Sequence, residues 1–240
     1  MSAPSTAAVA WQLERTSLVV IWDRGEEPVD WIAASTNTFV TGLTELLDLP
    51  RLRDAYRNLW PVDEEEQRRF VHANPVTYED EIHRERGYSV WLYGVEGSPR
   101  LNIDAGGPRG EGGRIPLHRA GLNFDPRYTP TPPRETIDDL VALAVRAWQP
   151  LLVCWTTTDV VQASGRHGWD VRAGYRVWIS TDVGTVTETA DDITARPLEG
   201  GTLITAPDEW DALRVAHAVN ATLDANGLHD IRRSPEHPTP

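Results

Sequence analysis

Apolar runs alternate along the chain with polar, turn-forming segments, and their spacing predicts both strands and helices. The short apolar runs at 17–22 (SLVVIW), 88–93 (YSVWLY) and 151–155 (LLVCW) are typical of strands. Further strands are expected at 100–104, 114–124, 175–180 and 202–205. The short links between the middle strands favour antiparallel pairing, because parallel neighbours need a long crossover connection.

Four other segments repeat their apolar residues every three or four positions, which is the period of a helix. The clearest covers 133–148, and a second covers 30–49. A third begins near Asp63, because Asp63 and Glu66 have the spacing of a helix N-cap and its capping partner. The last is expected over 208–226.

Together these elements predict an α+β protein with a mostly antiparallel sheet and helices packed on one face. The chain has 240 residues, and we expect a single domain over 12–228. Residues 1–11 and 229–240 are polar or rich in Pro, Ser and Ala, so both are expected to be flexible tails.

Charge and residue usage exclude several classes of function. The net charge of −13 argues against a nucleic-acid binder, which needs clustered cationic side chains. All 23 basic residues are Arg, so Walker phosphate loops and Schiff-base chemistry are excluded. A single cysteine favours a reducing, cytoplasmic location. With no run of ~18 apolar residues, no membrane span is expected.

Three sets of residues contain types that could carry chemistry. Cys154, His167 and Asp170 are the residue types of a thiol hydrolase, but Cys154 lies in an apolar run, where a cysteine is more often buried. The glycine-rich stretch 104–113 lacks the lysine and the following helix of a phosphate loop. One charge run contains the ligand types of a metal site, although such runs are usually solvated: Glu79, Asp80, Glu81, His83 and Glu85. We therefore expect no cofactor, no metal and no catalytic residue.

The most uneven charge distribution is in the C-terminal third. Eight acids lie between positions 182 and 211, against the single base Arg196. The part at 181–197 lies between two expected strands and is predicted to be an exposed loop. Simple solubility accounts for such acids equally well. The functional hypothesis is a surface that meets a cationic partner, with these candidate partner-binding residues: Asp182, Glu188, Asp191 and Asp192.

The second half of the chain resembles the Immunity protein 52 family of bacterial polymorphic toxin systems. The segments that carry the resemblance are TIDDLVALAVRAWQPLLVCW (136–155), GYRVWIS (174–180), GGTLITAPDEW (200–210) and AHAVNATLDANGL (216–228). The segment at about 51–87 has no counterpart there and is expected to be an insertion.

The resemblance implies a non-enzymatic α+β antitoxin that binds and neutralises a cognate toxin, often one with a nuclease domain. A nuclease carries a basic surface for its substrate, which an acidic protein can cover. Two alternatives stay open: a small metal-dependent or thiol hydrolase that uses His83 or His167, and a non-catalytic scaffold domain.

Overall fold

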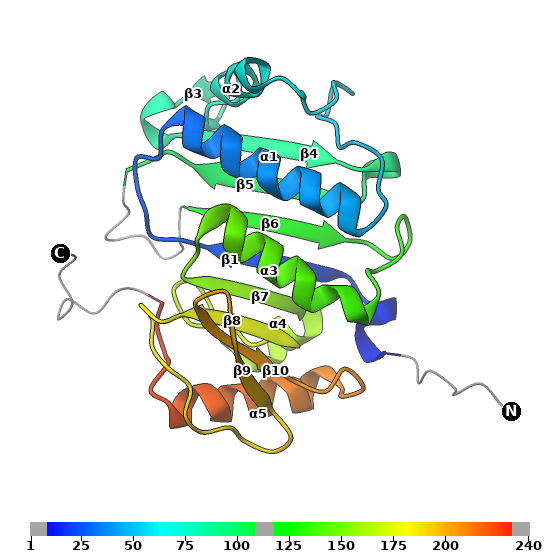
Figure 1. Cartoon of the computed structure of the whole chain (residues 1–240), viewed down its shortest axis with the longest axis vertical. Coiled ribbons are helices and arrows are strands. Elements are labelled where there is room, and N and C mark those ends of the chain that lie inside the picture. Colours follow the sequence, from blue (N-terminus) through cyan, green and yellow to red (C-terminus); the bar gives the residue numbers. More distant parts are fainter. Residues whose placement is uncertain (1–8, 109–117, 232–240) are drawn as a thin grey trace, which may run out of the picture.

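The computed structural model describes residues 9–108 and 118–231, and its central feature is one eight-stranded sheet (Figure 1). Each strand is antiparallel to its neighbours. The order across the sheet is β4 (Tyr88–Tyr93), β5 (Arg100–Ala105), β6 (Arg119–Phe124), β1 (Thr16–Ile21), β7 (Leu152–Thr157), β8 (Arg176–Ser180), β10 (Gly201–Thr205) and β9 (Thr194–Leu198).

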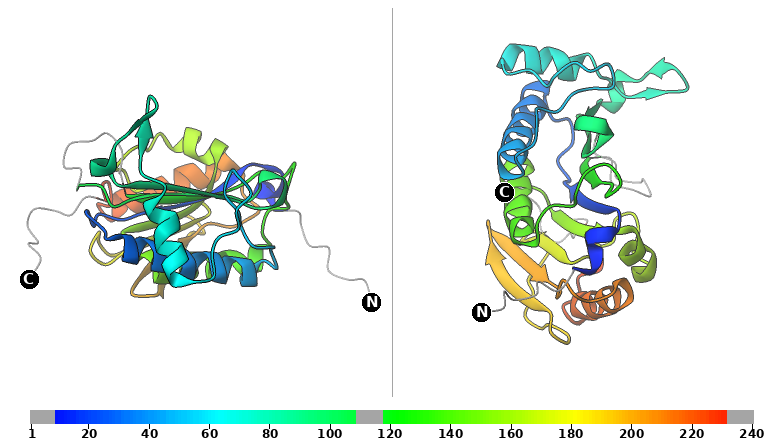
Figure 2. Two further views of the ribbon diagram at one scale, coloured as in Figure 1. Left: turned by 90° about the horizontal axis from the view of Figure 1, so that it is seen from above. Right: turned by 90° about the vertical axis from the view of Figure 1, so that its right-hand side faces the viewer.

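Helices cover the two faces of this sheet unequally. α1 (Val29–Leu46) and α3 (Ile137–Trp148) lie on one face, while α4 (Thr158–Ser164) and α5 (Ala212–Ala225) lie on the other (Figure 2). The burial of the strands agrees, because β7 is buried along its whole length whereas β5 and β6 bury only alternate residues. Among the described residues, helices therefore cover the half of the sheet formed by β4, β5 and β6 on one face only.

The predicted α+β class and antiparallel sheet are confirmed, but the expectation that helices pack on one face is corrected. Apolar spacing reveals that a helix has a buried side, and it does not reveal against which face of the sheet that side packs. α4 was missed because its seven residues are too few to show a helical period. Strand β9 was also missed, because all of it except Leu198 lies in the segment 181–197, which is predicted to be a loop.

Several helix boundaries follow from local chemistry that the sequence revealed. The Asp63 carboxylate accepts a hydrogen bond from the Glu66 backbone N–H at 3.0 Å, which caps α2 (Glu64–His72). Asp211 caps α5 in the same way, accepting from the backbone N–H of Arg214 at 2.9 Å. Helix α3 follows a short 3-10 turn, η4 (Arg134–Thr136).

The described residues at the inner ends of both expected tails belong to the folded core, which corrects their assignment to flexible tails. Trp11 is fully buried in the 3-10 turn η1 (Ala10–Leu13), although it was placed in the N-terminal tail. Ile231 is fully buried as well, and its backbone N–H donates to the Trp169 carbonyl at 2.9 Å. Residues 1–8 and 232–240 of the expected tails lie outside the described residues, as do positions 109–113 of the glycine-rich stretch.

Aromatic side chains fill the space between the helices and the sheet. Trp148 of α3 stacks on Trp22 with ring centroids 6.1 Å apart, and Phe39 of α1 lies 4.3 Å from Trp148 on a tilted plane. Trp11 meets Trp155 of β7 edge to face at 5.6 Å. Such offset and edge contacts are the arrangements that aromatic rings prefer, so the tryptophans act mainly as core.

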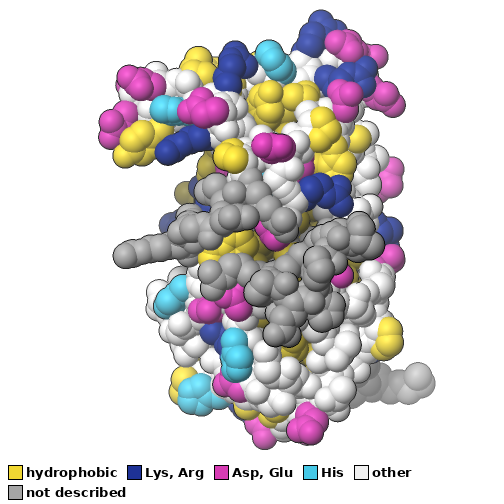
Figure 3. All heavy atoms as spheres, turned by 90° about the vertical axis from the view of Figure 1, so that its left-hand side faces the viewer, with side chains coloured by type: hydrophobic (Ala, Val, Ile, Leu, Met, Phe, Trp, Pro, Cys, Tyr) yellow, Lys and Arg dark blue, Asp and Glu magenta, His cyan; other side chains and the backbone are white. Residues whose placement is uncertain are grey.

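The segment 51–87, expected to be an insertion, forms α2 and a separate two-stranded hairpin of β2 (Thr77–Tyr78) and β3 (Glu81–Ile82). α2 packs on α1 at the β4 end of the sheet (Figure 1). Two further 3-10 turns, η2 (Arg84–Arg86) and η3 (Val95–Gly97), flank β4. At this end of the molecule, uppermost in Figure 3, hydrophobic side chains are exposed beside acids and arginines.

No helix in the described ranges is long and apolar enough to cross a membrane.

Candidate functional site

The four predicted partner-binding acids lie on one segment, residues 181–193, which we call the acidic strap. Asp182, Glu188, Asp191 and Asp192 are all exposed. The strap connects β8 to β9 and runs along the C-terminal part of α5. The predicted exposure of these four acids is therefore confirmed.

Side chains of α5 and of the residue after it fix the course of the strap. The amide oxygen of Asn226 accepts from the backbone N–H groups of Thr187 at 2.7 Å and Glu188 at 3.2 Å. Its amide nitrogen donates to the Glu188 carbonyl at 2.7 Å. The buried hydroxyl of Thr222 accepts from the Ala190 backbone N–H at 3.0 Å. The strap is thus an ordered segment rather than a loose loop.

Three of the four strap carboxylates, those of Glu188, Asp191 and Asp192, have at most one positive neighbour among the described residues. Asp192 lies 3.7 Å from the guanidinium of Arg214, with both side chains more than half exposed. Glu188 and Asp191 form no ion pair with any other residue in the described part of the chain. An exposed pair such as Asp192 with Arg214 contributes little stability and is easily exchanged for a partner's base.

A polar pocket of about 520 Å³ adjoins the start of the strap, with Asp182 in its wall. Two of its arginines already have protein partners. Arg24 donates to the Gln149 side chain at 3.0 Å and lies over the Trp31 ring, and Arg146 pairs with Glu199 at 2.8 Å. The pocket is therefore a patch of internally paired charges beside the strap.

Other acids of the stretch from 182 to 211 have structural roles that the sequence did not distinguish. Glu199 pairs with Arg146, and Asp211 caps α5. Asp208 is only 2 % exposed and belongs to a buried ion pair. The charge count of this region therefore overstates the acidity that a partner would meet.

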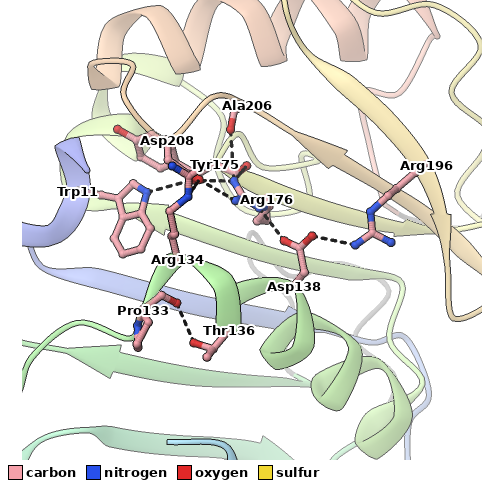
Figure 4. A network of polar contacts seen from close by, with 10 residues as sticks. All are labelled: Trp11, Pro133, Arg134, Thr136, Asp138, Tyr175, Arg176, Arg196, Ala206 and Asp208. Carbon is pink, nitrogen blue, oxygen red and sulfur yellow. Dashed lines mark hydrogen bonds and ion pairs between the residues drawn. The ribbon is translucent and has the colours of Figure 1, made fainter. Parts of the chain in front are cut away.

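Asp208 is the centre of a buried polar network that joins five segments of the chain (Figure 4). The Arg176 guanidinium donates to both carboxylate oxygens of Asp208, at 2.8 and 2.9 Å. The Trp11 indole N–H donates to the same carboxylate at 3.2 Å, and Arg134 lies 3.3 Å from it. A two-point contact between Arg and a carboxylate fixes orientation as well as distance.

The same guanidinium also reaches the first turn of α3. Its Nε donates to Asp138 at 2.7 Å, and Arg196 of β9 donates to the other oxygen of Asp138 at 2.8 Å. Burial would raise the pKa of Asp138, but hydrogen bonds from Arg196 and Arg176 outweigh it and hold that pKa below 3.8. The hydrogen-bonding groups of this network find their partners within the network itself. We therefore assign it a structural role, which is to hold these segments together.

The thiol-hydrolase residues are not arranged for catalysis. Cys154 is fully buried and donates to the Ala173 carbonyl at 3.4 Å. Burial raises the pKa of its thiol to about 12, so the thiolate needed for attack is not formed at neutral pH. The Asp170 carboxylate accepts from the His167 backbone N–H at 2.8 Å, which is a local turn contact.

The charge run at 79–85 is exposed at every position except the half-buried His83. Its only ion pair within the described residues joins His83 Nδ1 to Glu85 at 2.9 Å. In the ranges that the structure describes, no three His, Cys, Asp or Glu side chains are grouped to hold a metal ion.

A second buried polar cluster was not recognised in the sequence. The Glu27 carboxylate accepts from the Trp22 indole at 2.7 Å and from the Gly106 backbone N–H at 2.7 Å. His118 Nδ1 lies 2.9 Å from the same carboxylate, although its N–H is not well aligned with the oxygen, so this contact is chiefly electrostatic. No local pattern brings Glu27 and His118 together, because they are 91 positions apart.

Comparisons with known proteins add little about function. No family model matches the chain, and no curated protein matches it. A T6SS protein of Pseudomonas aeruginosa has a similar structure, with 12 % identity, a TM-score of 0.45, and coverage of 95 % of this chain and 73 % of that protein. A likeness of this degree carries no argument about function, and the resemblance to the Immunity protein 52 family stays a hypothesis.

The buried network predicts that Asp208→Ala destabilises the protein strongly. The substitution leaves the Arg176 charge buried with Asp138 as its only carboxylate, and breaking a buried pair costs about 3–5 kcal/mol. Urea unfolding followed by tryptophan fluorescence measures this loss. Glu209→Ala, at the exposed neighbouring position, is the control and should leave the free energy of unfolding within about 0.5 kcal/mol. Equal effects of the two substitutions would contradict the structural role of Asp208.

The contact between His118 and Glu27 predicts a pH-dependent contribution to stability. Burial alone would lower the pKa of His118, but the Glu27 carboxylate outweighs it and raises that pKa above 6.5. The contribution of this histidine to stability is therefore complete when the pH is below the pKa of His118 in the unfolded chain. It is lost as the pH rises through the raised pKa of His118 in the folded protein. Burial alone would raise the pKa of Glu27, but the contact with His118 outweighs it and lowers that pKa below 4.5. The contribution of the Glu27 carboxylate to stability is therefore lost only as the pH falls through this lowered pKa.

His118→Gln should therefore cost most stability near pH 6 and progressively less toward about pH 9. Urea midpoints of the unsubstituted protein and the variant across this range measure the difference. His217→Gln, at an exposed position of α5, controls for loss of a histidine and should give a constant difference. Parallel curves for His118→Gln would show that this histidine is not coupled to Glu27 as described.

Proposed function

We propose that this chain is an immunity protein that acts in the cytoplasm by binding and neutralising a cognate polymorphic toxin, without catalysing a reaction. The observation that carries the proposal is the acidic strap. Its carboxylates are exposed, and hydrogen bonds to Asn226 and Thr222 hold its backbone in place. A charged surface that is already ordered loses less conformational entropy when it binds.

The chemistry of the strap suits a toxin with a nuclease domain. A nuclease holds the phosphates of its substrate on a surface rich in Arg and Lys. Carboxylates at Asp182, Glu188, Asp191 and Asp192 are complementary to such a surface, and they favour rapid association more than they add raw affinity. The resemblance of residues 136–228 to the Immunity protein 52 family supports the same reading.

The alternative of a thiol hydrolase has an observation against it, because the candidate nucleophile Cys154 is fully buried with a raised pKa. A scaffold domain is separated from an immunity protein by experiment. The product of the adjacent gene is the natural candidate for the toxin. The proposal predicts that cells producing this toxin survive when they also make this protein in excess, and that the two proteins purify together.

Killing of such cells, with this protein shown to be folded and abundant, would overturn the proposal. A catalytically inactivated toxin with the same expression level controls for toxicity of the host system itself. Survival without formation of a complex would contradict neutralisation by binding.

The strap itself is tested by reversing its charges. Asp191→Arg with Asp192→Arg should slow association with the toxin several-fold at low salt and reduce the dependence of that rate on ionic strength. Stopped-flow fluorescence measures the rate. Glu45→Arg with Asp48→Arg makes the same change in net charge at exposed positions near the end of α1 and should have a smaller effect. Equal rates for the two double variants would place the interface elsewhere.

A further inference from the structure

The β2–β3 hairpin is separate from the main sheet and projects from the body of the described residues. In the right-hand view of Figure 2 it extends away from the body on the side of the sheet opposite α1. Two residues of β2 pair with two of β3, and Glu79 and Asp80 form the turn. All six residues from Thr77 to Ile82 are exposed.

The base of this hairpin is fastened to the fold, while its tip has no support from the rest of the described chain. The Val76 backbone N–H donates to the Gly87 carbonyl at 3.0 Å, and the His83 N–H donates to the Val76 carbonyl at 2.8 Å. Gly87 has a φ of 87°, and a Cβ there would lie 2.2 Å from the Ala105 carbonyl oxygen. Since strands of two residues are not stable alone, these contacts at the base set the direction in which the tip points.

The turn residues are not those that would stabilise the hairpin best. Glu79 and Asp80 have φ values of 50° and 64°, a left-handed conformation that favours Gly and Asn. Asn-Gly is the preferred pair for a two-residue turn with both φ values positive. The chain has two carboxylates there instead. None of the three acids Glu79, Asp80 and Glu81 forms an ion pair with a described residue.

The flanks of the hairpin carry exposed apolar side chains on both sides. Thr77 faces Ile82 across the ladder and Tyr78 faces Glu81, so Tyr78 and Ile82 point to opposite faces. Tyr78 is 59 % exposed and Ile82 is 61 % exposed. The hairpin therefore has the form of a wedge, with an apolar group on each face and carboxylates at its tip (Figure 3).

We infer that this hairpin is a docking element that inserts into a cationic cleft of the partner protein, an inference that rests on the proposed function. The tip carboxylates meet Arg or Lys side chains at the floor of the cleft, and Tyr78 and Ile82 pack on its walls. Buried aromatic and aliphatic anchors supply most of the affinity of tight complexes, whereas exposed charges mainly guide approach. The hairpin lies at the β4 end of the sheet and α5, which holds the strap, lies at the other end (Figure 1), so the two surfaces can be tested separately.

The decisive variant is Glu79→Asn with Asp80→Gly in the full-length chain. It removes two carboxylates and installs the turn residues that suit this conformation, so the melting temperature should stay the same or rise. Affinity for the inactivated toxin encoded by the adjacent gene, measured by surface plasmon resonance, should fall at least about tenfold. A loss of affinity without a loss of stability cannot come from misfolding.

A second pair of variants tests the apolar flanks. Tyr78→Ser with Ile82→Ser should weaken binding to the same toxin at least about tenfold. Tyr56→Ser with Val62→Ser is the matched control, since these side chains are 87 % and 78 % exposed on the loop before α2. Its affinity should stay within about twofold of the unsubstituted protein.

The outcomes separate the two proposals. If the unsubstituted protein does not bind the toxin, the proposed function fails and the docking element fails with it. If it binds and neutralises the toxin but both hairpin variants keep their affinity, the immunity function stands and the hairpin is not the docking element.

Discussion

The buried guanidinium of Arg176 is the constraint on which the arrangement of the second half of the chain depends. It donates to Asp138 on α3, to Asp208 before α5 and to the carbonyls of Tyr175 and Ala206. A buried cation without such partners would be very costly, so the elements that supply the partners must take up these positions together. The network adds little net stability, because the cost of burying its charges offsets their attraction. It does fix the relative positions of the elements that carry these charges.

The position of the acidic strap follows from this constraint through α5. Asp208 fixes the chain that enters the helix, and Asp211 caps the first turn. Two turns or more further along, Thr222 and Asn226 hold the backbone of the strap through their side chains. An exposed surface is thus ordered by contacts that begin in the interior, which is the condition for a charged segment to be presented without a large entropic cost on binding.

Much of the fold could be predicted from the sequence because its strands and long helices bury regular apolar patterns. What could not be predicted depends on contacts distant along the chain. Strand β9 (TARPL) has only exposed or partly exposed residues and a proline, so it lacks the alternation that marks a strand. The β2–β3 turn has acids in place of Gly or Asn.

For the candidate site, too, the sequence indicated which segment is acidic but not which partners its acids contact. Composition identified an acidic segment, and the structure shows that its four candidate acids are exposed. Composition could not tell Asp208, which is buried beside Arg176, from Asp191, which is exposed. Nor could it connect Glu27 with His118. The role of an acid in this protein is decided by its tertiary partner, which a single sequence does not reveal.

The two edges of the sheet limit how a partner can be recognised. On the β4 edge, Tyr93 exchanges backbone hydrogen bonds with Arg53, and the Ser89 N–H donates to Asn74. On the β9 edge, Pro197 lacks an N–H, and a proline there weakens any strand added to it. Extension of the sheet by a partner strand is therefore disfavoured at both edges. The proposed recognition of a partner therefore relies on side chains presented on fixed backbone, such as those of the strap and of the hairpin.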